Sequence, residues 1–538
     1  MTHHLIEHSF FFTTEEREAI YRSNSAVNTR PVSFVTRIFF RLWTYISVKL
    51  LNEQIAPNAI TMVGLLCCLQ AYQLIHTYYR YGEEEERGGM PLRECAVHAV
   101  GPGNHNHNCS AYKDFFEANR PVQTATIFAA LLLMVSIVCG SLDGVHAKRC
   151  RIATSLGDIF ARVCSSISRV FIALTVLEVM HVNDIGTKWY VLLTLQLIEF
   201  NTVLGRINAE NLRKDKVKNW AYVATYCFRD SEISFLMLAL MALRWIFPPF
   251  ASYLHHVNHH YVQWGYCFLL CLSFLNIALL KMCVKHKSSI AICLVARVMP
   301  IFYLLPFNEY SILSITGDAL VVGLLSTEVY VSHLCRRRMH AAVTLICIGS
   351  IFNAVVAVTG TVVYVIGILV DLSYSLNLPI FVPVRNVYID GVFDLCHAGH
   401  KRMMAKALSF GNRLIVGVCG DDECTAYKRR PIMTTEERVN EVKLCKYVSE
   451  VIPNVPTTGV TEGMIKFYNI HVVACGEEYN SPDDTYYEVP RRLGILRTLP
   501  RTPGISTSLL INRIRLASDA EVVAKDKLSG KSRVGDNE

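Results

Sequence analysis

Long apolar segments separated by short polar loops fill the first 378 residues of the chain. Each segment is close to the roughly 20 residues that an α-helix needs to cross a bilayer. The expected spans are residues 59–79, 122–142, 166–182, 189–206, 232–248, 263–281, 289–306 and 312–334, followed by a longer apolar stretch at 341–378. This pattern predicts a polytopic α-helical membrane domain.

The charges of the connecting loops support this topology. Lysine and arginine gather after every even-numbered span, at Lys148, Arg149 and Arg151, at Arg213, Lys214, Lys216 and Lys218, at Lys281, Lys285 and Lys287, and at Arg336, Arg337 and Arg338. Because basic loops stay on the cytosolic side of a membrane, these loops are expected to face the cytosol. The loop after the first span instead carries the sequon Asn108–Cys109–Ser110, as a lumenal loop would.

A different pattern begins after Pro379 and Pro383. Short apolar runs that predict strands lie at 385–391, 412–419, 449–452 and 470–475, with helical segments between them. Thr434 followed by Glu437 is a capping box, which predicts a helix that runs to about Tyr447. Alternating strands and helices predict a Rossmann-like α/β domain with a parallel sheet and a ligand at the carboxyl ends of its strands.

Composition agrees with a membrane domain joined to a soluble one. The 538 residues allow more than one domain, and only 18% of them are charged, against about 25% in typical soluble domains. The net charge is +8. No compact basic patch with interleaved aromatic residues is present in the sequence, so we assign this charge to cytosolic loops and not to nucleic-acid binding. The 19 cysteines form no CxxC pair, which argues against a zinc site or a redox motif.

The strongest candidate for chemistry is the stretch Val387–His400, VYIDGVFDLCHAGH. It predicts a buried strand, a tight turn at Gly391, and a helix that starts at His397 and His400. The first N–H groups of a helix lack partners and the helix dipole is positive at that end. Side-chain donors and backbone N–H groups can therefore converge on one anion, and the stretch predicts a phosphate site.

Residues from about Val387 to Ile514 resemble the cytidylyltransferases of phospholipid synthesis. The resemblance rests on separated motifs in a fixed order, namely YIDGVFDLCHAGH, LIVGVCGDDECTAYK ending at Lys428, IMTTEERVNEV, and RTPGISTS from Arg501 to Ser508. The FDLxHxGH form, the IVGVC strand and the ISTS ending are more similar to the choline-phosphate enzymes than to the ethanolamine-phosphate enzymes. The latter usually carry two tandem catalytic domains.

The resemblance implies the reaction CTP + phosphocholine → CDP-choline + pyrophosphate, in which a phosphate oxygen attacks the α-phosphorus of CTP. It implies that His397 and His400 stabilise the α-phosphate, that Lys428 neutralises phosphates from the opposite side, and that Arg501 holds the leaving pyrophosphate. Mg²⁺ is expected to enter with the CTP phosphates. The other substrate-binding positions that the motifs imply are Asp390, Gly391, Val392, Phe393, Thr502, Gly504, Ile505, Ser506 and Thr507.

Two departures from the family pattern leave the alcohol phosphate open. Cys475 stands where family members carry a histidine before an acidic pair, and Thr457 stands where the choline enzymes place a tryptophan. A quaternary ammonium binds well over aromatic faces. The candidates for such a cage are Tyr479, Tyr486 and Tyr487. Phosphoethanolamine, whose primary ammonium prefers acceptors such as Glu477 or Glu478, is the alternative substrate.

The membrane domain resembles a second family, the CDP-alcohol phosphotransferases that make phosphatidylcholine and phosphatidylethanolamine. The resemblance rests on APNAITMVGL, which starts at Ala56, and on DGVHAK, residues Asp143–Lys148. The family pattern D-x-x-D-G-x-x-A-R-x8-G-x3-D-x3-D implies two metal ions held by its carboxylates. The corresponding positions here are Gly140, Asp143, Gly144, Ala147, Lys148, Gly157, Ala161 and Ser165. Because only Asp143 keeps its carboxylate and hard divalent cations need several oxygen ligands, we expect this domain to be inactive.

Five parts are therefore expected along the chain: a cytosolic N-terminal segment (1–58), a CDP-alcohol phosphotransferase-like transmembrane domain (59–378), a linker (379–384), a cytidylyltransferase domain (385–515) and a polar C-terminal tail (516–538). The tail lacks the long amphipathic helix of the lipid-sensing cytidylyltransferases. Because CTP is cytosolic, the stretch 341–378 is expected to form two short spans that turn near Thr359–Gly360.

The expected protein is a membrane-anchored enzyme of the endoplasmic reticulum whose catalytic domain faces the cytosol. A homodimer is expected, because members of both families are commonly dimeric. Two interpretations compete with this one. The first is a bifunctional enzyme in which the phosphotransferase step is also active. The second is a membrane scaffold without catalytic activity.

Overall fold

The computed structural model describes residues 11–13, 15–16, 19–20, 39–88, 120–212, 230–246, 259–279, 287–303, 311–376, 378–427, 429–456, 459–481 and 483–532. The chain divides between Pro383 and Val384 into two compact units, which we describe separately. Lys428, Thr457 and the sequon at Asn108 lie outside the described residues.

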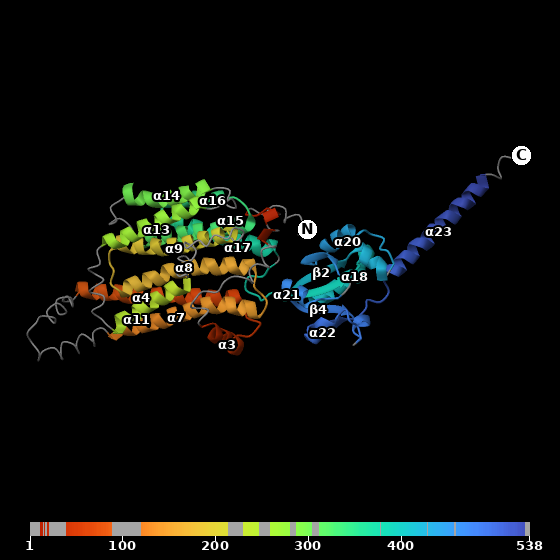
Figure 1. Cartoon of the computed structure of the whole chain (residues 1–538), viewed down its shortest axis with the longest axis horizontal. Coiled ribbons are helices and arrows are strands. Elements are labelled where there is room, and N and C mark those ends of the chain that lie inside the picture. Colours follow the sequence, from red (N-terminus) through yellow and green to blue (C-terminus); the bar gives the residue numbers. More distant parts are fainter. Residues whose placement is uncertain are drawn as a thin grey trace, which may run out of the picture. The chain divides into compact units, whose positions relative to one another are not determined.

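The N-terminal unit consists of helices that lie side by side (Figure 1). Its described helices are α3 (Phe40–Leu50), α4 (Pro57–Gly88), α7 (Arg120–Arg149), α8 (Ser155–Val179), α9 (Ile185–Leu212), α11 (Asp230–Ile246), α13 (His259–Leu279), α14 (Lys287–Tyr303), α15 (Ile312–Cys335), α16 (Ala341–Phe352) and α17 (Ala354–Ser375). Within the described residues, six segments are long and apolar enough to cross a membrane: Pro57–Tyr78, Thr124–Arg149, Ser155–Val179, Tyr261–Ala278, Ile312–Cys335 and Ala354–Ser375.

The predicted helical domain is therefore confirmed at the level of helix length and composition. Two shorter apolar helices, Ile233–Arg244 and Ala341–Phe352, lie at further expected spans. The expected spans 189–206 and 289–306 fall in α9 and α14, which are helical but are not among the six.

Polar contacts inside the bundle join α8, α9 and α15. Arg169 on α8 forms an ion pair with Glu199 on α9, and both side chains are buried. Trp189 on α9 donates from Nε1 to Asp318 Oδ2 on α15 at 2.8 Å. A charge removed from water needs such a partner, since the alternative is an uncompensated desolvation cost.

The apolar stretch 341–378 folds as a helical hairpin, as predicted, but it turns at Asn353 and not near Thr359–Gly360. Asn353 caps α17, because its Oδ1 accepts from Val355 N at 2.8 Å. α16 and α17 run antiparallel, since a Cβ built on Gly349 lies 3.0 Å from Val356 and one on Gly360 lies 3.0 Å from Ile346. With its 12 residues, α16 is only about 18 Å long.

The two ends of this hairpin lie on the same side of the N-terminal unit. Phe11 bridges them: its carbonyl oxygen accepts from Arg337, just before α16, and its N–H donates to Asp371 Oδ2, near the end of α17, at 3.2 Å. Tyr364 on α17 also donates to the buried Glu328, which pairs with Arg337. The chain therefore leaves α17 on the side where Arg336 and Arg338 are exposed.

The C-terminal unit contains a five-stranded parallel sheet of order β3-β2-β1-β4-β5. The strands are β1 (Asn386–Gly391), β2 (Arg413–Cys419), β3 (Glu450–Val455), β4 (Ile470–Gly476) and β5 (Leu496–Leu499). β1 to β4 confirm the four expected strands, with β3 displaced by a few residues. β5 was not expected, because it is a four-residue run between Gly494 and Pro500 without a clear alternation.

Alternate residues of the strands build two cores, one on each face of the sheet. Val387 and Ile389 pack with Met404 of α18 (Ala398–Leu408) and Val442 of α20 (Thr435–Lys443). Tyr388 on the opposite face packs in a second core. Ile465 of α21 (Glu462–Phe467), Cys475 and Tyr487 belong to the same core. β1 is enclosed by both cores, which places its carboxyl end at the centre of the unit.

The remaining short elements are η2 (Asp394–Cys396), α19 (Asp421–Tyr427), η3 (Glu477–Tyr479) and α22 (Glu488–Arg492). The predicted capping box of α20 is present: Glu437 N donates to Thr434 Oγ1 at 3.3 Å, and Thr434 N donates to Glu437 Oε2 at 2.8 Å. The last helix, α23, spans Thr507–Ser532. Most of the segment predicted to be a polar tail is therefore helical, in keeping with its alanine, leucine and lysine residues, which favour helices.

Candidate active site

Two histidines stack at the amino end of α18. His397 is the N-cap residue, and its Nδ1 accepts from Gly399 N at 3.1 Å. The ring of His400 lies on the ring of His397 with the centroids 4.0 Å apart. Gly399 is required between them, since a Cβ at this position would lie 2.9 Å from the His397 ring and 3.0 Å from Ile505 Cγ2. The sequence HAGH thus holds two imidazoles at a helix amino end.

Both imidazoles are neutral near pH 7. Burial lowers the pKa of His397, and burial together with the neighbouring His397 lowers the pKa of His400 to about 4. Because Nδ1 of His397 accepts a hydrogen bond, the proton of that ring is assigned to Nε2. His400 Nδ1 is buried and has no hydrogen-bond partner among the described residues. The site therefore offers neutral N–H donors and not imidazolium cations.

A second helix amino end meets the first. Ser506 caps α23, because its Oγ accepts from Leu509 N at 3.2 Å. Thr507 Oγ1 lies 3.4 Å from His397 Nε2 and donates to the Asp394 carbonyl oxygen at 3.4 Å. A helix thus begins within the ISTS segment. Two helix amino ends with free N–H groups converge here, which favours an anion.

The other residues of the RTPGISTS segment form the turn before α23. Arg501 is exposed, Thr502 is partly buried, and Gly504 has a φ of +80°, a conformation that favours glycine. The exposed guanidinium of Arg501 is free to turn toward a phosphate. Among the described residues no hydrogen bond or ion pair fixes the role of Arg501, which stays a prediction.

The carboxylate of Asp390 lies at the carboxyl end of β1 and is held by tyrosines. Tyr486 donates to Asp390 Oδ2 at 2.6 Å, and Tyr487 donates to Oδ1 at 2.5 Å. The nearby hydroxyl of Tyr388 also acts to lower the pKa of this carboxylate. Desolvation raises the pKa of Asp390, and the three hydroxyl groups oppose that rise. Among the described residues, Asp390 has no ion-pair partner.

The predicted cage residues therefore lie together, and Asp390 lies with them. The ring centroids of Tyr486 and Tyr487 are 4.8 Å apart, with the rings edge to face. The ring centroids of Tyr479 and Tyr487 are 6.5 Å apart. The sequence analysis predicted Asp390 as a substrate-binding position, and the structure shows its carboxylate in this aromatic cluster. The acidic alternatives Glu477 and Glu478 are exposed on η3.

The turn between Asp390 and His397 is tightly built. Phe393 and Leu395 both have a φ of 54°, a strained conformation for residues with side chains. Phe393 packs its ring edge against His400 with the centroids 5.4 Å apart, and a Cβ on Gly391 would lie 3.2 Å from Phe393. The carbonyl of Val392 accepts from Arg438. The sequence analysis did not identify Tyr388, Asp394 and Arg438, which the structure adds to this region.

The positions of the N-terminal motif do not rebuild a metal site. α7 carries Gly140, Asp143, Gly144, Ala147 and Lys148, and α8 carries Gly157, Ala161 and Ser165. The carboxylate of Asp143 accepts from Thr61 Oγ1 at 2.6 Å. Nowhere in the described residues do three or more histidine, cysteine, aspartate or glutamate side chains come together as metal ligands.

Residues 388–513 match a family model described as cytidylyltransferase-like. The C-terminal unit carries a cytidylyltransferase-like domain. The probable ethanolamine-phosphate cytidylyltransferase of Encephalitozoon cuniculi is 38% identical to this chain over 136 residues, which are 25% of this chain and 42% of that protein. Choline-phosphate cytidylyltransferase A of Homo sapiens is 41% identical over 151 residues, which are 27% of this chain and 40% of that protein.

The cytidylyltransferase-like domain therefore has relatives named for either alcohol. The ethanolamine-phosphate cytidylyltransferase of Dictyostelium discoideum is 36% identical over 138 residues, 25% of this chain and 38% of that protein. The chain spans less than half the length of each of these relatives. The residues that match the family model lie within the C-terminal unit.

Proposed function

We propose that the chain is a membrane-anchored CTP:phosphocholine cytidylyltransferase, a nucleotidyltransferase that makes CDP-choline and pyrophosphate for phosphatidylcholine synthesis. The observation that carries this proposal is that two features, the histidine pair and the Asp390–tyrosine cluster, both lie at the carboxyl end of β1. Stacked neutral histidines and two helix amino ends favour the phosphates of a nucleotide. A carboxylate ringed by tyrosines, a few residues away along the chain, favours a cationic headgroup.

The chemistry that these groups support is positioning and charge stabilisation. A phosphate monoester oxygen is already anionic near pH 7, so the attack on the α-phosphorus of CTP needs no strong base. The N–H groups of His397 and His400 donate to the oxygens on which charge develops in the transition state. The first N–H groups of α23, whose start the Thr507 hydroxyl fixes against the Asp394 carbonyl oxygen, hold the departing pyrophosphate. Catalysis comes from alignment of the reacting atoms and from preorganised donors.

Mg²⁺ belongs to this proposal as part of the Mg–CTP substrate. The described residues offer no cluster of ligands for a dedicated ion. Mg²⁺ is commonly bound by substrate phosphates with one or two carboxylates and retained waters. The metal then neutralises phosphate charge, while the residues of this chain orient the nucleotide and donate hydrogen bonds.

The tyrosines around Asp390 favour phosphocholine over phosphoethanolamine. A carboxylate has about four acceptor positions, and the hydroxyls of Tyr486 and Tyr487 occupy two of them. A primary ammonium brings three N–H donors that need acceptors. A quaternary ammonium brings none and needs only negative charge and aromatic surface. The cluster therefore fits a trimethylammonium group, and phosphoethanolamine is the runner-up.

A direct test uses the full chain purified in detergent with CTP and phosphocholine. We expect CDP-choline and pyrophosphate to form in equal amounts, and no product when choline replaces phosphocholine, because the phosphate is the nucleophile. The absence of any CTP-dependent product would overturn the proposal and favour a non-catalytic membrane scaffold.

The pH dependence of the reaction should follow the substrate and not the histidines. The second pKa of a phosphate monoester is about 6, so kcat/KM for phosphocholine should fall as the pH drops through that value. His400, whose pKa is about 4, stays neutral over this range. A phosphonate analogue with a higher second pKa should move the inflection upward. An inflection of kcat/KM near pH 6.5 that does not move with the substrate would contradict the assignment of both histidines as neutral donors.

We propose that the apolar helices of the N-terminal unit anchor the enzyme in a membrane, of the endoplasmic reticulum, with the catalytic domain in the cytosol. Six segments of suitable length and hydropathy support this anchor. α16 and α17 run antiparallel and Phe11 bridges Arg337 before α16 to Asp371 near the end of α17, so the hairpin enters and leaves on one side. That side carries Arg336 and Arg338, which the positive-inside rule assigns to the cytosol.

A glycosylation acceptor tag fused after Glu538 tests this topology. We expect the tag to stay unmodified in cells, because the hairpin returns the chain to the cytosolic side. The same tag inserted in the loop that follows the first span, near Asn108, is the positive control and should be glycosylated. Modification of the C-terminal tag would contradict the proposed orientation.

We also propose that the N-terminal unit is an inactive relative of the CDP-alcohol phosphotransferases. In support, Asp143 is the only acidic residue left at the motif carboxylates, and Thr61 occupies it. A bifunctional enzyme would need two metal ions at these positions, and Gly140, Ala161 and Ser165 provide no carboxylate ligands.

A further inference from the structure

The carboxylate of Asp394 holds a segment that is distant in the sequence. Asp394 lies in the turn just before His397, and only 4% of its surface is exposed. Its Oδ1 accepts from the backbone N–H groups of Ile432 and Met433, both at 3.1 Å. Its Oδ2 pairs with the Arg429 guanidinium at 3.2 Å. Three donors from one segment therefore converge on a single buried carboxylate.

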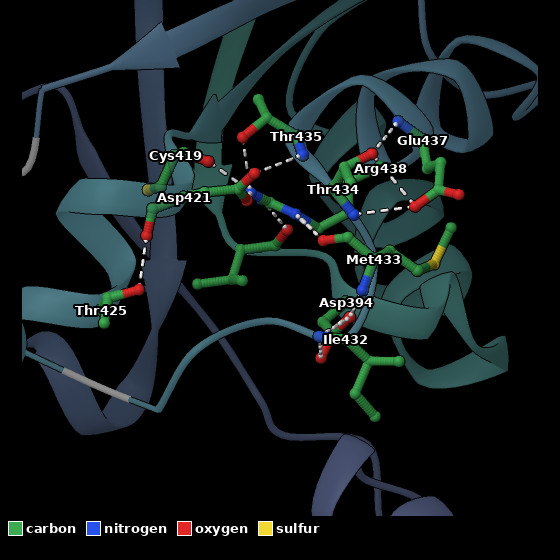
Figure 2. Close-up of polar contacts among 11 residues, drawn as sticks. Asp394, Cys419, Asp421, Thr425, Ile432, Met433, Thr434, Thr435, Glu437 and Arg438 are labelled. Carbon is green, nitrogen blue, oxygen red and sulfur yellow. Dashed lines mark hydrogen bonds and ion pairs between the residues drawn. The ribbon is translucent and has the colours of Figure 1, made fainter.

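Arg438 holds the same segment from the other side (Figure 2). Its side chain is fully buried, and Nε donates to the Met433 carbonyl oxygen at 3.2 Å. Nη1 donates to the carbonyl oxygens of Val392 at 2.8 Å and Cys419 at 2.9 Å. The backbone N–H of Met433 thus donates to Asp394, and its carbonyl oxygen accepts from Arg438.

Asp394 also touches the phosphate-binding features directly. Its backbone carbonyl oxygen accepts from Thr507 Oγ1, which lies beside His397 Nε2. The side chain and the main chain of one residue thereby connect the histidine turn, the start of α23 and the segment 429–435. These three parts are far apart in the sequence, and the fold brings them together at Asp394.

We propose that Asp394 is a positioning residue for nucleotidyl transfer: it fixes the basic segment 429–435 and the Thr507 turn against the two histidines. The inference rests on the proposed function and deepens it. Asp394 itself is buried behind the site and touches no substrate. Its effect is on alignment, and a displacement of about 1 Å in a reacting group can cost about 100-fold in rate.

If Asp394 only stabilised the fold, its loss would have a different kinetic effect. Loss of a purely structural anchor lowers the melting temperature and the fraction of folded protein, but the folded fraction keeps its kcat. Loss of a positioning residue lowers kcat of the folded enzyme while the KM values stay close to those of the wild type, since the ground-state contacts with the substrates are unchanged.

The test compares Asp394→Asn with Glu450→Gln in the purified full chain. Glu450 is a matched control, because it is also a mostly buried carboxylate in an ion pair, with Arg413 at 3.5 Å, but it lies at the amino ends of β3 and β2, away from the site. The asparagine keeps one acceptor oxygen for the backbone N–H groups and places an NH₂ group against Arg429.

We expect Asp394→Asn to lower kcat about 30- to 100-fold with both KM values within about threefold of the wild type. Glu450→Gln should lower the melting temperature by a similar amount and keep kcat. A wild-type kcat in folded Asp394→Asn protein, or an equal loss in both variants, would overturn the proposal.

Arg429→Gln decides the question if Asp394→Asn does not fold. The side chain of Arg429 is half exposed, so this change spares the core and removes one of the three donors. We expect a three- to tenfold lower kcat with unchanged KM, and an unchanged kcat would overturn the proposal. A wild-type chain that makes no CDP-alcohol would overturn the proposed function, and the positioning role with it.

Discussion

Replacing His400 with alanine is expected to lower kcat for CDP-choline formation about 100- to 1,000-fold, with a small change in the KM for CTP. The imidazole is a preorganised donor in a water-poor site, and removal of one such donor typically costs this much. Its pKa of about 4 keeps it neutral at pH 7. Steady-state kinetics of the purified variant, with CTP and phosphocholine varied in turn, measure the effect.

His471 provides the control for this change. Its Nδ1 accepts from Asn386 N at 3.0 Å. This contact lies at the amino end of β1, whereas the candidate site lies at the carboxyl ends of the strands. A glutamine can supply an acceptor there, so His471→Gln should keep kcat near the wild-type value. A His400→Ala variant that retained kcat within about tenfold would contradict the role given to the stacked histidines.

Replacing Asp390 with asparagine is expected to raise the KM for phosphocholine about 30- to 100-fold and to leave the KM for CTP unchanged. The carboxylate of Asp390 accepts directly from the hydroxyls of Tyr486 and Tyr487. Loss of the partner of a desolvated charge typically costs 2–5 kcal/mol. We expect the lower part of this range, because Asp390 is only partly buried. The same kinetic assay reports both KM values.

Tyr486→Phe gives a graded companion to that variant. It removes the hydroxyl that donates to Asp390 Oδ2 at 2.6 Å and keeps the ring. The freed acceptor position should improve the kcat/KM for phosphoethanolamine several-fold relative to phosphocholine. An Asp390→Asn variant whose KM rose for CTP alone would contradict the headgroup role and return Asp390 to the nucleotide site.

The sheet and the histidine turn were predictable because their signals are local. β1, β2 and β4 are short apolar runs, and HAGH follows β1 directly in the sequence. The cap of α20 at Thr434 was predictable for the same reason, since a capping box is defined within four residues. The roles of these residues in catalysis are carried by the resemblance and by the geometry together.

Asp394 and Arg438 could not be recognised from the sequence, because their burial depends on distant parts of the chain. Arg438 lies in the polar run TTEERVNEV, which has the composition of an exposed helix face. Its side chain is buried only because β1 and β2 end side by side and present the carbonyl groups of Val392 and Cys419. Tyr388 was hidden in the same way, as an ordinary strand residue whose hydroxyl happens to reach Asp390.

The position of the hairpin turn could have been read from the sequence. The turn was predicted near Thr359–Gly360, whereas it lies at Asn353. Asparagine is among the best N-cap residues, and Gly360 is accommodated within α17, where it allows close contact with Ile346 on α16. In an apolar stretch, the capping residue was the better signal.

The most direct measurement is the ratio of kcat/KM for phosphocholine to kcat/KM for phosphoethanolamine, with CTP saturating and the full chain purified in detergent. The tyrosine hydroxyls on Asp390 predict a ratio of at least about 10 in favour of phosphocholine. A ratio below one would contradict the headgroup assignment and make the protein an ethanolamine-phosphate enzyme. The absence of product with either substrate would contradict the catalytic account as a whole.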